Sequence, residues 1–118
     1  MAETRGTNAP TNSSWFDGKR VMVVGLARSG YAAVRLLKSL HALPIVTDSK
    51  TGEQLAKTLV EHGKPDCPCF FGVDPLLLLH AVSAVVVSPA VPIDSPLAKR
   101  ALAMDIPVIS ELELVYLV

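Results

Sequence analysis

A glycine-containing turn near the beginning of the chain has residue types that suit the binding of an anion. Gly25 follows a short run of β-branched residues and permits a tight turn, and Gly30 lies at the start of a helical pattern. Gly30 has no side chain, so helix and strand can pack closely. The N-terminus of the helix would point free N–H groups and a positive dipole end at the turn, which favours a phosphate. Three residues of the turn are candidates for that contact: Ala27, Arg28 and Ser29.

The turn departs from the dinucleotide-binding fingerprint at its second glycine. The pattern is Gly-x-Ala-x-x-Gly, and Ala27 stands where NAD-binding proteins need a glycine so that pyrophosphate can touch the backbone. The chain also contains no Gly-x-x-x-x-Gly-Lys-Ser/Thr sequence, which is the ordinary phosphate loop for ATP. The motif by itself leaves two alternatives, a phosphate site that is not of the usual NAD kind and a turn that binds nothing.

Asp48 is a second candidate because it closes the next predicted strand. It follows Gly25 by about the spacing of a ribose-binding carboxylate. Its carboxylate could accept hydrogen bonds from two ribose hydroxyls or from the N–H of a base ring; alternatively, it caps the following helix. A third candidate is the loop Ser88-Pro89-Ala90, which follows the most apolar strand. No His lies at a suggestive spacing from Ser29 or Ser88, so we expect no catalytic residue in this chain.

Apolar runs alternate along the chain with helical patterns, which predicts an α/β domain. Strands are expected at residues 21–24, 45–47, 67–71, 82–87 and 107–109. The first helix should end at residues 42–44. The second should cover residues 52–62, with Val60 on its buried side. Later helices should begin at Ser95 and Ser110. The alternation favours a Rossmann-like five-stranded parallel sheet, in the order 3-2-1-4-5, with helices on both faces.

The three candidate segments should meet at one edge of this sheet. Residues 27–29 follow the first strand, residues 88–90 follow the fourth, and Asp48 closes the second. The order of the strands reverses between the first and the fourth, and open α/β sheets bind ligands outside the carboxyl ends of their strands at such a point. We therefore expect these segments to form one crevice.

Composition limits the class of protein. The chain has 118 residues, of which 50% are hydrophobic and 5% aromatic, so its core must be aliphatic. We expect residues 1–14 to be a flexible tail and residues 15–118 to form one domain. The formal net charge is zero, which argues against a nucleic-acid partner. No apolar run reaches membrane-spanning length, which argues against a membrane partner and favours a cytoplasmic protein. We also expect a monomer. Cys67 and Cys69 lack further metal ligands nearby, so we expect free thiols and no metal.

Four stretches of the chain, in the same order, resemble the Mur ligases. They are residues 18–30, 46–50, 86–92 and 107–114, and the match covers about residues 17–118. Within the family, the resemblance is to the members that add D-glutamate to UDP-N-acetylmuramoyl-L-alanine in peptidoglycan synthesis. It implies a three-domain ligase whose central domain binds ATP and Mg²⁺ and whose last domain helps to bind D-glutamate. ATP would form an acyl phosphate, which the amine of D-glutamate attacks.

The resemblance implies that this chain is the N-terminal, UDP-binding domain of such a ligase. By itself it should bind no cofactor and show no ligase activity; phosphate release dependent on both substrates would contradict this. Eight residues of the three candidate segments would contact UDP. Those at the diphosphate are Ala27, Arg28 and Ser29; those at the uracil are Asp48, Ser49 and Lys50; those beside the nucleotide are Ser88 and Ala90.

Two alternatives from other classes remain open. One is a NAD(P)-binding module of an oxidoreductase or of a potassium-channel regulator, which Ala27 argues against. The other is a non-catalytic interaction domain that uses the apolar residues 114–118. Separate titrations with UDP and NADH would distinguish these hypotheses.

Overall fold

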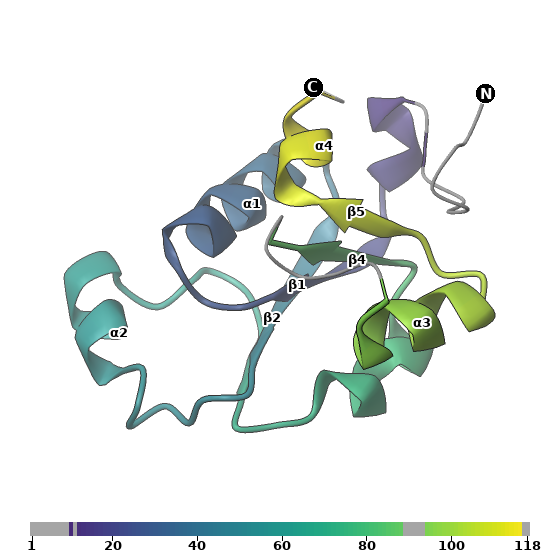
Figure 1. Ribbon diagram of the computed structural model, residues 1–118. Coiled ribbons are helices and arrows are strands. Elements are labelled where there is room, and N and C mark those ends of the chain that lie inside the picture. Colours follow the sequence, from purple (N-terminus) through teal and green to yellow (C-terminus); the bar gives the residue numbers. More distant parts are fainter. Residues whose placement is uncertain (1–9, 11, 89–93, 117–118) are drawn as a thin grey trace.

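A five-stranded parallel sheet forms the middle of the structure (Figure 1). The computed structural model describes residues 10, 12–88 and 94–116 of the chain. The strands are β1 Arg20–Val24, β2 Leu43–Asp48, β3 Cys69–Phe71, β4 Ala84–Val87 and β5 Val108–Ser110. Their order is β3-β2-β1-β4-β5 and every neighbouring pair is parallel, which confirms the predicted topology.

Helices cover both faces of this sheet (Figure 1). The α-helices are α1 Arg28–Ser39, α2 Ala56–His62, α3 Pro96–Ala103 and α4 Glu111–Tyr116, and the 3₁₀ helices are η1 Ser13–Phe16 and η2 Pro75–Ala81. Helices α1 and α4 lie side by side over one face, and α3 and η2 lie over the other. The helices change sides because each crossover is right-handed and the strand order reverses at β1.

Two apolar cores form because neighbouring residues of a strand point to opposite faces. Val21 and Val23 of β1 lie in the core beneath α1, whereas Met22 between them lies in the core beneath η2 and α3. In β4, Val86 belongs to the first core and Val85 to the second. All five side chains are fully buried, which is why these strands read as continuous apolar runs.

Helix α1 packs closely on the turn that precedes it. Gly30 is buried in the first turn of α1, and a Cβ built on it would overlap the carbonyl oxygen of Gly25. Gly25 itself has a φ of +98°, a left-handed conformation that favours glycine. Backbone geometry therefore requires both glycines of the motif.

The predicted caps hold two helix starts, and a side chain holds one helix end. The Ser95 side chain accepts a hydrogen bond from a backbone N–H of α3. Ser110 and Glu113 form a reciprocal capping box at α4, with donor–acceptor distances of 2.9 and 3.0 Å. Gly63 ends α2 with a φ of +79°, and its carbonyl accepts a hydrogen bond of 2.6 Å from the Tyr31 hydroxyl. This last bond fastens the end of α2 to α1.

Strand β2 begins earlier than the sequence predicts. Helix α1 ends before residues 42–44, and Leu43 and Pro44 belong to β2. The Leu43 N–H donates to Lys19 O on the β1 side at 2.8 Å, so the nitrogen of Pro44 faces the other side of the strand. On that side β3 pairs only from Val46 onward. The strand tolerates this proline because no neighbouring carbonyl needs its missing N–H.

The N-terminal segment also differs from the expectation. Helix η1 begins at Ser13, inside the segment 1–14 that we expected to be a tail. The Asn12 side chain accepts a hydrogen bond of 3.1 Å from the Ser14 N–H and so caps η1. Residues 1–9 and 11 lie outside the described residues.

Helix α2 is shorter than predicted. It begins at Ala56, and Val60, which we expected on its buried side, is 85% exposed. Leu55 directly before the helix is buried, and Leu59 packs against the core beneath α1. Val60 lies about 100° further around the helix than Leu59 and faces outward.

We expect Gly30→Ala to destabilise the fold by about 1–3 kcal/mol, because the new Cβ would overlap the Gly25 carbonyl oxygen and force α1 away from the sheet. Chemical denaturation measures the change in the free energy of unfolding. Gly52→Ala is the matched control, since a Cβ there meets only the Phe71 ring at an ordinary 3.8 Å, and it should change stability by less than about 0.5 kcal/mol. Equal stabilities of the two variants would contradict the close packing.

Candidate functional site

The turn between β1 and α1 is held against the end of β2. The Gly25 N–H donates to the carbonyl oxygen of Thr47 at 2.8 Å. The next amide, that of Leu26, donates to Oδ2 of Asp48 at 2.9 Å. Two consecutive N–H groups of the turn are therefore used by two consecutive residues of β2, which fixes the turn at the carboxyl edge of the sheet.

Helix α1 begins without a side-chain cap. Ala27 occupies the N-cap position with extended backbone (φ −132°), and it has no polar side-chain atom to accept a hydrogen bond. The first intrahelical bond runs from Tyr31 N–H to Ala27 O at 3.1 Å. The amides of residues 28–30 come before it and so have no acceptor within the helix. The first turn of α1 contains no acidic residue, and Arg28 and Ser29 are exposed. Unfilled amides at a positive helix end form a site for an anion.

Helix α2 is the other α-helix described without a side-chain cap, and its environment differs. Its N-cap residue, Leu55, already donates its N–H to Thr51 O at 3.0 Å, because a turn leads into the helix. With only seven residues it also has a weaker dipole than α1. Of the two, only α1 begins at the point where the strand order reverses.

Asp48 lies beside this helix end, and its carboxylate faces the turn. Oδ2 accepts the hydrogen bond from Leu26 N–H, and Oδ1 accepts another from Lys50 N–H at 2.9 Å. The alternative that Asp48 caps the next helix is wrong, because Leu55 occupies the N-cap position of α2. The carboxylate stays half-buried at the edge of the sheet, where each oxygen still has a lone pair.

The remaining predicted site residues lie on the loops at the same edge. Ser49 and Lys50 are exposed directly after β2. Ser88 is half-buried directly after β4. Ala90 lies outside the described residues. The structure thus brings together the β1–α1 turn, the end of β2 and the end of β4, as the strand order predicts.

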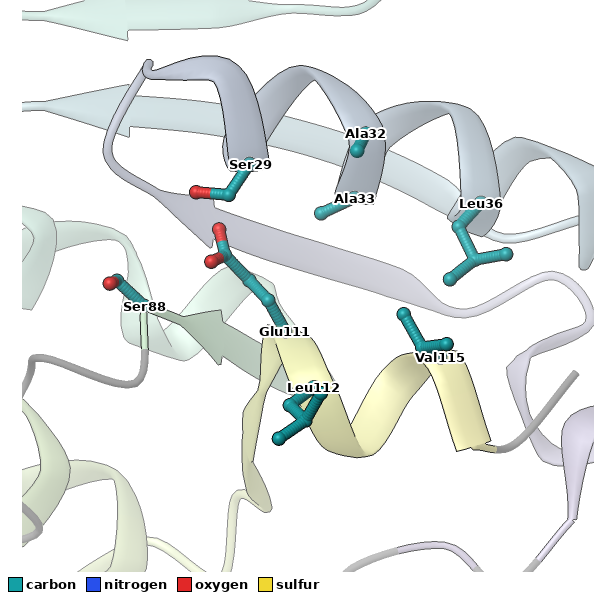
Figure 2. Close-up of a pocket in the computed structure, with 8 residues that line it drawn as sticks. All are labelled: Ser29, Ala32, Ala33, Leu36, Ser88, Glu111, Leu112 and Val115. Atoms are coloured by element: carbon teal, nitrogen blue, oxygen red, sulfur yellow. The ribbon is translucent and has the colours of Figure 1, made fainter.

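A cavity of about 380 Å³ opens between α1 and α4 next to this edge (Figure 2). Its polar lining residues are Ser29 and Ser88, which the sequence analysis named as candidates, and Glu111, which it did not. In Figure 2 the side chains of Ser29 and Glu111 point toward one another. The remaining lining residues are apolar and come from the two helices: Ala32, Ala33, Leu36, Leu112 and Val115.

Glu111 carries no site signal in the sequence. It follows Ser110 inside a capping box, where an acidic residue is explained by the helix dipole alone. Only the contact between α1 and α4 places its carboxylate beside Ser29.

The two cysteines are free thiols, as the sequence predicts. Burial raises the pKa of the Cys67 thiol to about 11, and the neighbouring Cys69 adds to the shift. Cys67 is therefore neutral at physiological pH, and a neutral thiol is a poor nucleophile and metal ligand. Within the described ranges, no three His, Cys, Asp or Glu side chains come together as a metal site. Among the helices of those same residues, none has the length and apolar character needed to cross a membrane.

Comparison with solved structures supports the fold. Shikimate dehydrogenase from Aquifex aeolicus superimposes with a TM-score of 0.55 over 88% of this chain and 51% of that chain. The two sequences are 14% identical, so the likeness shows the shared α/β architecture and nothing about the ligand.

Comparison with curated proteins gives closer relatives. The chain is 43% identical over 107 residues to proteins named UDP-N-acetylmuramoylalanine--D-glutamate ligase from Streptococcus pyogenes serotype M49 (strain NZ131) and serotype M1. The aligned region covers 87% of this chain and 23% of each relative. The chain therefore spans about a quarter of the length of the curated relatives it matches.

A family match covers most of the described fold. Residues 19–110 match the family described as Mur ligase MurD-like, N-terminal domain. The matched region begins just before β1 and ends with β5, so it includes the turn, Asp48 and Ser88. The chain belongs to the MurD-like N-terminal domains of the Mur ligase family.

Proposed function

We propose that this domain binds the UDP part of UDP-N-acetylmuramoyl-L-alanine within a ligase that adds D-glutamate during peptidoglycan synthesis. The observation that carries the proposal is the uncapped start of α1, which offers free amides where the strand order of the sheet reverses. The names of the 43% identical relatives supply the ligand and the reaction.

The diphosphate is proposed to lie at the first turn of α1. The amides of residues 28–30 donate to it, and the exposed guanidinium of Arg28 can add a charged contact. The Ser29 hydroxyl stands on the same turn. Ala27 has the smallest side chain after glycine, so the phosphates can still approach the backbone from the solvent side.

The uracil is proposed to lie over the end of β2. The Asp48 oxygens retain lone pairs that can accept a hydrogen bond from the N–H of the base, and Ser49 supplies a hydroxyl. Lys50 can contribute a point charge but no flat, forked contact. Ser88 and Ala90 are proposed to flank the nucleotide at the end of β4.

The chemistry of the whole protein is proposed to lie in its other domains. ATP and Mg²⁺ would be held in a central domain and D-glutamate by a C-terminal domain, because this chain has no phosphate loop for ATP. The inactivity of this domain alone, its cytoplasmic location and its monomeric state stay predictions.

Calorimetric titration of the chain with UDP and, separately, with NADH tests the proposal. We expect one UDP to bind per chain and no saturable heat with NADH, because the Ala27 Cβ stands where the usual NAD geometry needs a glycine. Saturable binding of NADH without binding of UDP would instead support a dinucleotide-binding module.

We expect Arg28→Glu to change stability and UDP affinity in opposite directions. A carboxylate in the first turn of α1 interacts well with the helix dipole and should stabilise the fold by about 0.3–1 kcal/mol. The same charge repels a diphosphate, and the charged contact of Arg28 is lost, so UDP affinity should fall about tenfold to a hundredfold. Thermal melts and calorimetry give the two values.

Arg35→Glu is the matched control for this variant. Arg35 is exposed on the same helix, two turns away from its start, so the charge change is the same but the anion site is untouched. Equal losses of UDP affinity in the two variants would show that overall charge, and not the start of α1, governs binding.

A further inference from the structure

We propose that Asp48 is the positioning residue of this site, because its carboxylate sets the shape of the β1–α1 turn before any ligand binds. The inference rests on the proposed function, in which the turn receives the diphosphate. It assigns to Asp48 a role that acts through the backbone of another segment and is separate from contact with the base.

The hydrogen bond from Leu26 N–H to Asp48 Oδ2 carries this inference. It measures 2.9 Å and joins residues that are 22 positions apart in the sequence. It directly follows the bond from Gly25 N–H to Thr47 O at 2.8 Å. Without the carboxylate, the turn would be tied to β2 at Gly25 alone, and the peptide at Leu26 could rotate.

Asp48 also joins two further loops to the turn. Its Oδ1 accepts from Lys50 N–H, which folds the β2–α2 loop back on the strand end. Its main-chain oxygen and that of Lys50 each accept from Gly72 N–H at 2.8 Å, and Gly72 directly follows β3. One residue thus connects the segments that follow β1, β2 and β3.

The carboxylate also decides which backbone amides of the turn remain available to a ligand. Leu26 N–H is occupied by Asp48, whereas the amides of residues 28–30 come before the first intrahelical bond. The negative charge beside Leu26 repels a phosphate from that amide. An anion is thereby directed to the start of α1. Asp48 therefore determines where along the turn the diphosphate lies.

Both oxygens of the side chain must be acceptors for this arrangement. Each accepts from one backbone N–H, so an amide side chain of the same shape would set its NH₂ group against one of those donors. Asp48→Asn would leave one oxygen that can still accept from Leu26 N–H, so Asp48→Ala, which removes both acceptors, is the decisive variant.

The first experiment measures amide hydrogen exchange by NMR in the ligand-free chain. In the unsubstituted protein, Leu26 should exchange more slowly than Arg28 and Ser29 by about tenfold or more, because only Leu26 has a protein acceptor. In Asp48→Ala, Leu26 should lose about tenfold in protection, because both acceptor oxygens are removed. Equal exchange of Leu26 and Ser29 in the unsubstituted protein overturns the proposal, even if the variant does not fold.

The second experiment measures UDP affinity of the same proteins by calorimetry. We expect Asp48→Ala to bind UDP about tenfold to a hundredfold more weakly. Asp17→Ala is the control: it removes the same charge from an exposed carboxylate just before β1, at the opposite edge of the sheet, and should leave both UDP affinity and Leu26 exchange unchanged.

The two experiments separate the possible outcomes. If Asp48→Ala weakens UDP binding but leaves Leu26 exchange unchanged, Asp48 acts by contact alone and the positioning role is wrong. If Leu26 loses protection but UDP affinity is unchanged, the role is also wrong, because the turn does not need Asp48 for binding. If the unsubstituted chain binds no UDP, the proposed function fails, and the exchange data still show whether the hydrogen bond exists.

Discussion

The close approach of α1 to the turn before it is the constraint on which the rest of the structure depends. Gly30 lets the first turn of α1 rest on the carbonyl group of Gly25, and the Gly25 N–H in turn reaches Thr47 O of β2. One tight turn therefore fixes the direction in which α1 leaves the sheet. It also fixes how the end of β1 is aligned with the end of β2. Val34 and Leu37 of α1 are buried beneath it only because the helix lies this near to the strands.

The start of α1 lacks a stabilising side-chain cap, and its first backbone N–H groups remain free to donate. A serine or aspartate in place of Ala27 would stabilise the helix by about 1 kcal/mol. Such caps occur elsewhere in the chain, where Asp74, Ser95 and Ser110 accept hydrogen bonds from the starts of η2, α3 and α4. A side-chain cap on α1 would occupy the amides that an anion needs, so the missing cap at this helix start fits the proposed binding of a phosphate.

Negative charges limit where an anion can lie at this edge. The Asp48 carboxylate stands on the β2 side of the turn, and the Glu111 carboxylate points toward Ser29 from α4 (Figure 2). Arg28 is exposed at the start of α1. In the proposed function, Arg28 and the positive helix end attract a phosphate to the first turn of α1, whereas the Asp48 carboxylate disfavours it at Leu26 and the Glu111 carboxylate disfavours it beside Ser29.

Local pattern was enough to predict the elements of the fold and their order. The strands are buried on both faces, so their apolar runs are visible in the sequence, and Ser95 and Ser110 mark helix starts through hydrogen bonds to residues three positions away. The spacing of Gly25 and Gly30 predicts the tight turn for the same reason, since both requirements are local. The right-handed crossover rule then gives the strand order.

Tertiary structure decided what depends on segments far apart in the chain. Pro44 enters β2 because the short strand β3 leaves its nitrogen without a neighbour. Val60 is exposed because α2 turns Leu59, and not Val60, toward the core. Glu111 lines the cavity only because α4 packs on α1. The sequence marked Asp48 as a site residue by its spacing, but its hydrogen bond to Leu26 N–H depends on how two strand ends are aligned across the sheet. The distance between Leu26 N and Asp48 Oδ2 cannot be predicted from a local sequence pattern, because the parallel pairing of β1 and β2 sets it.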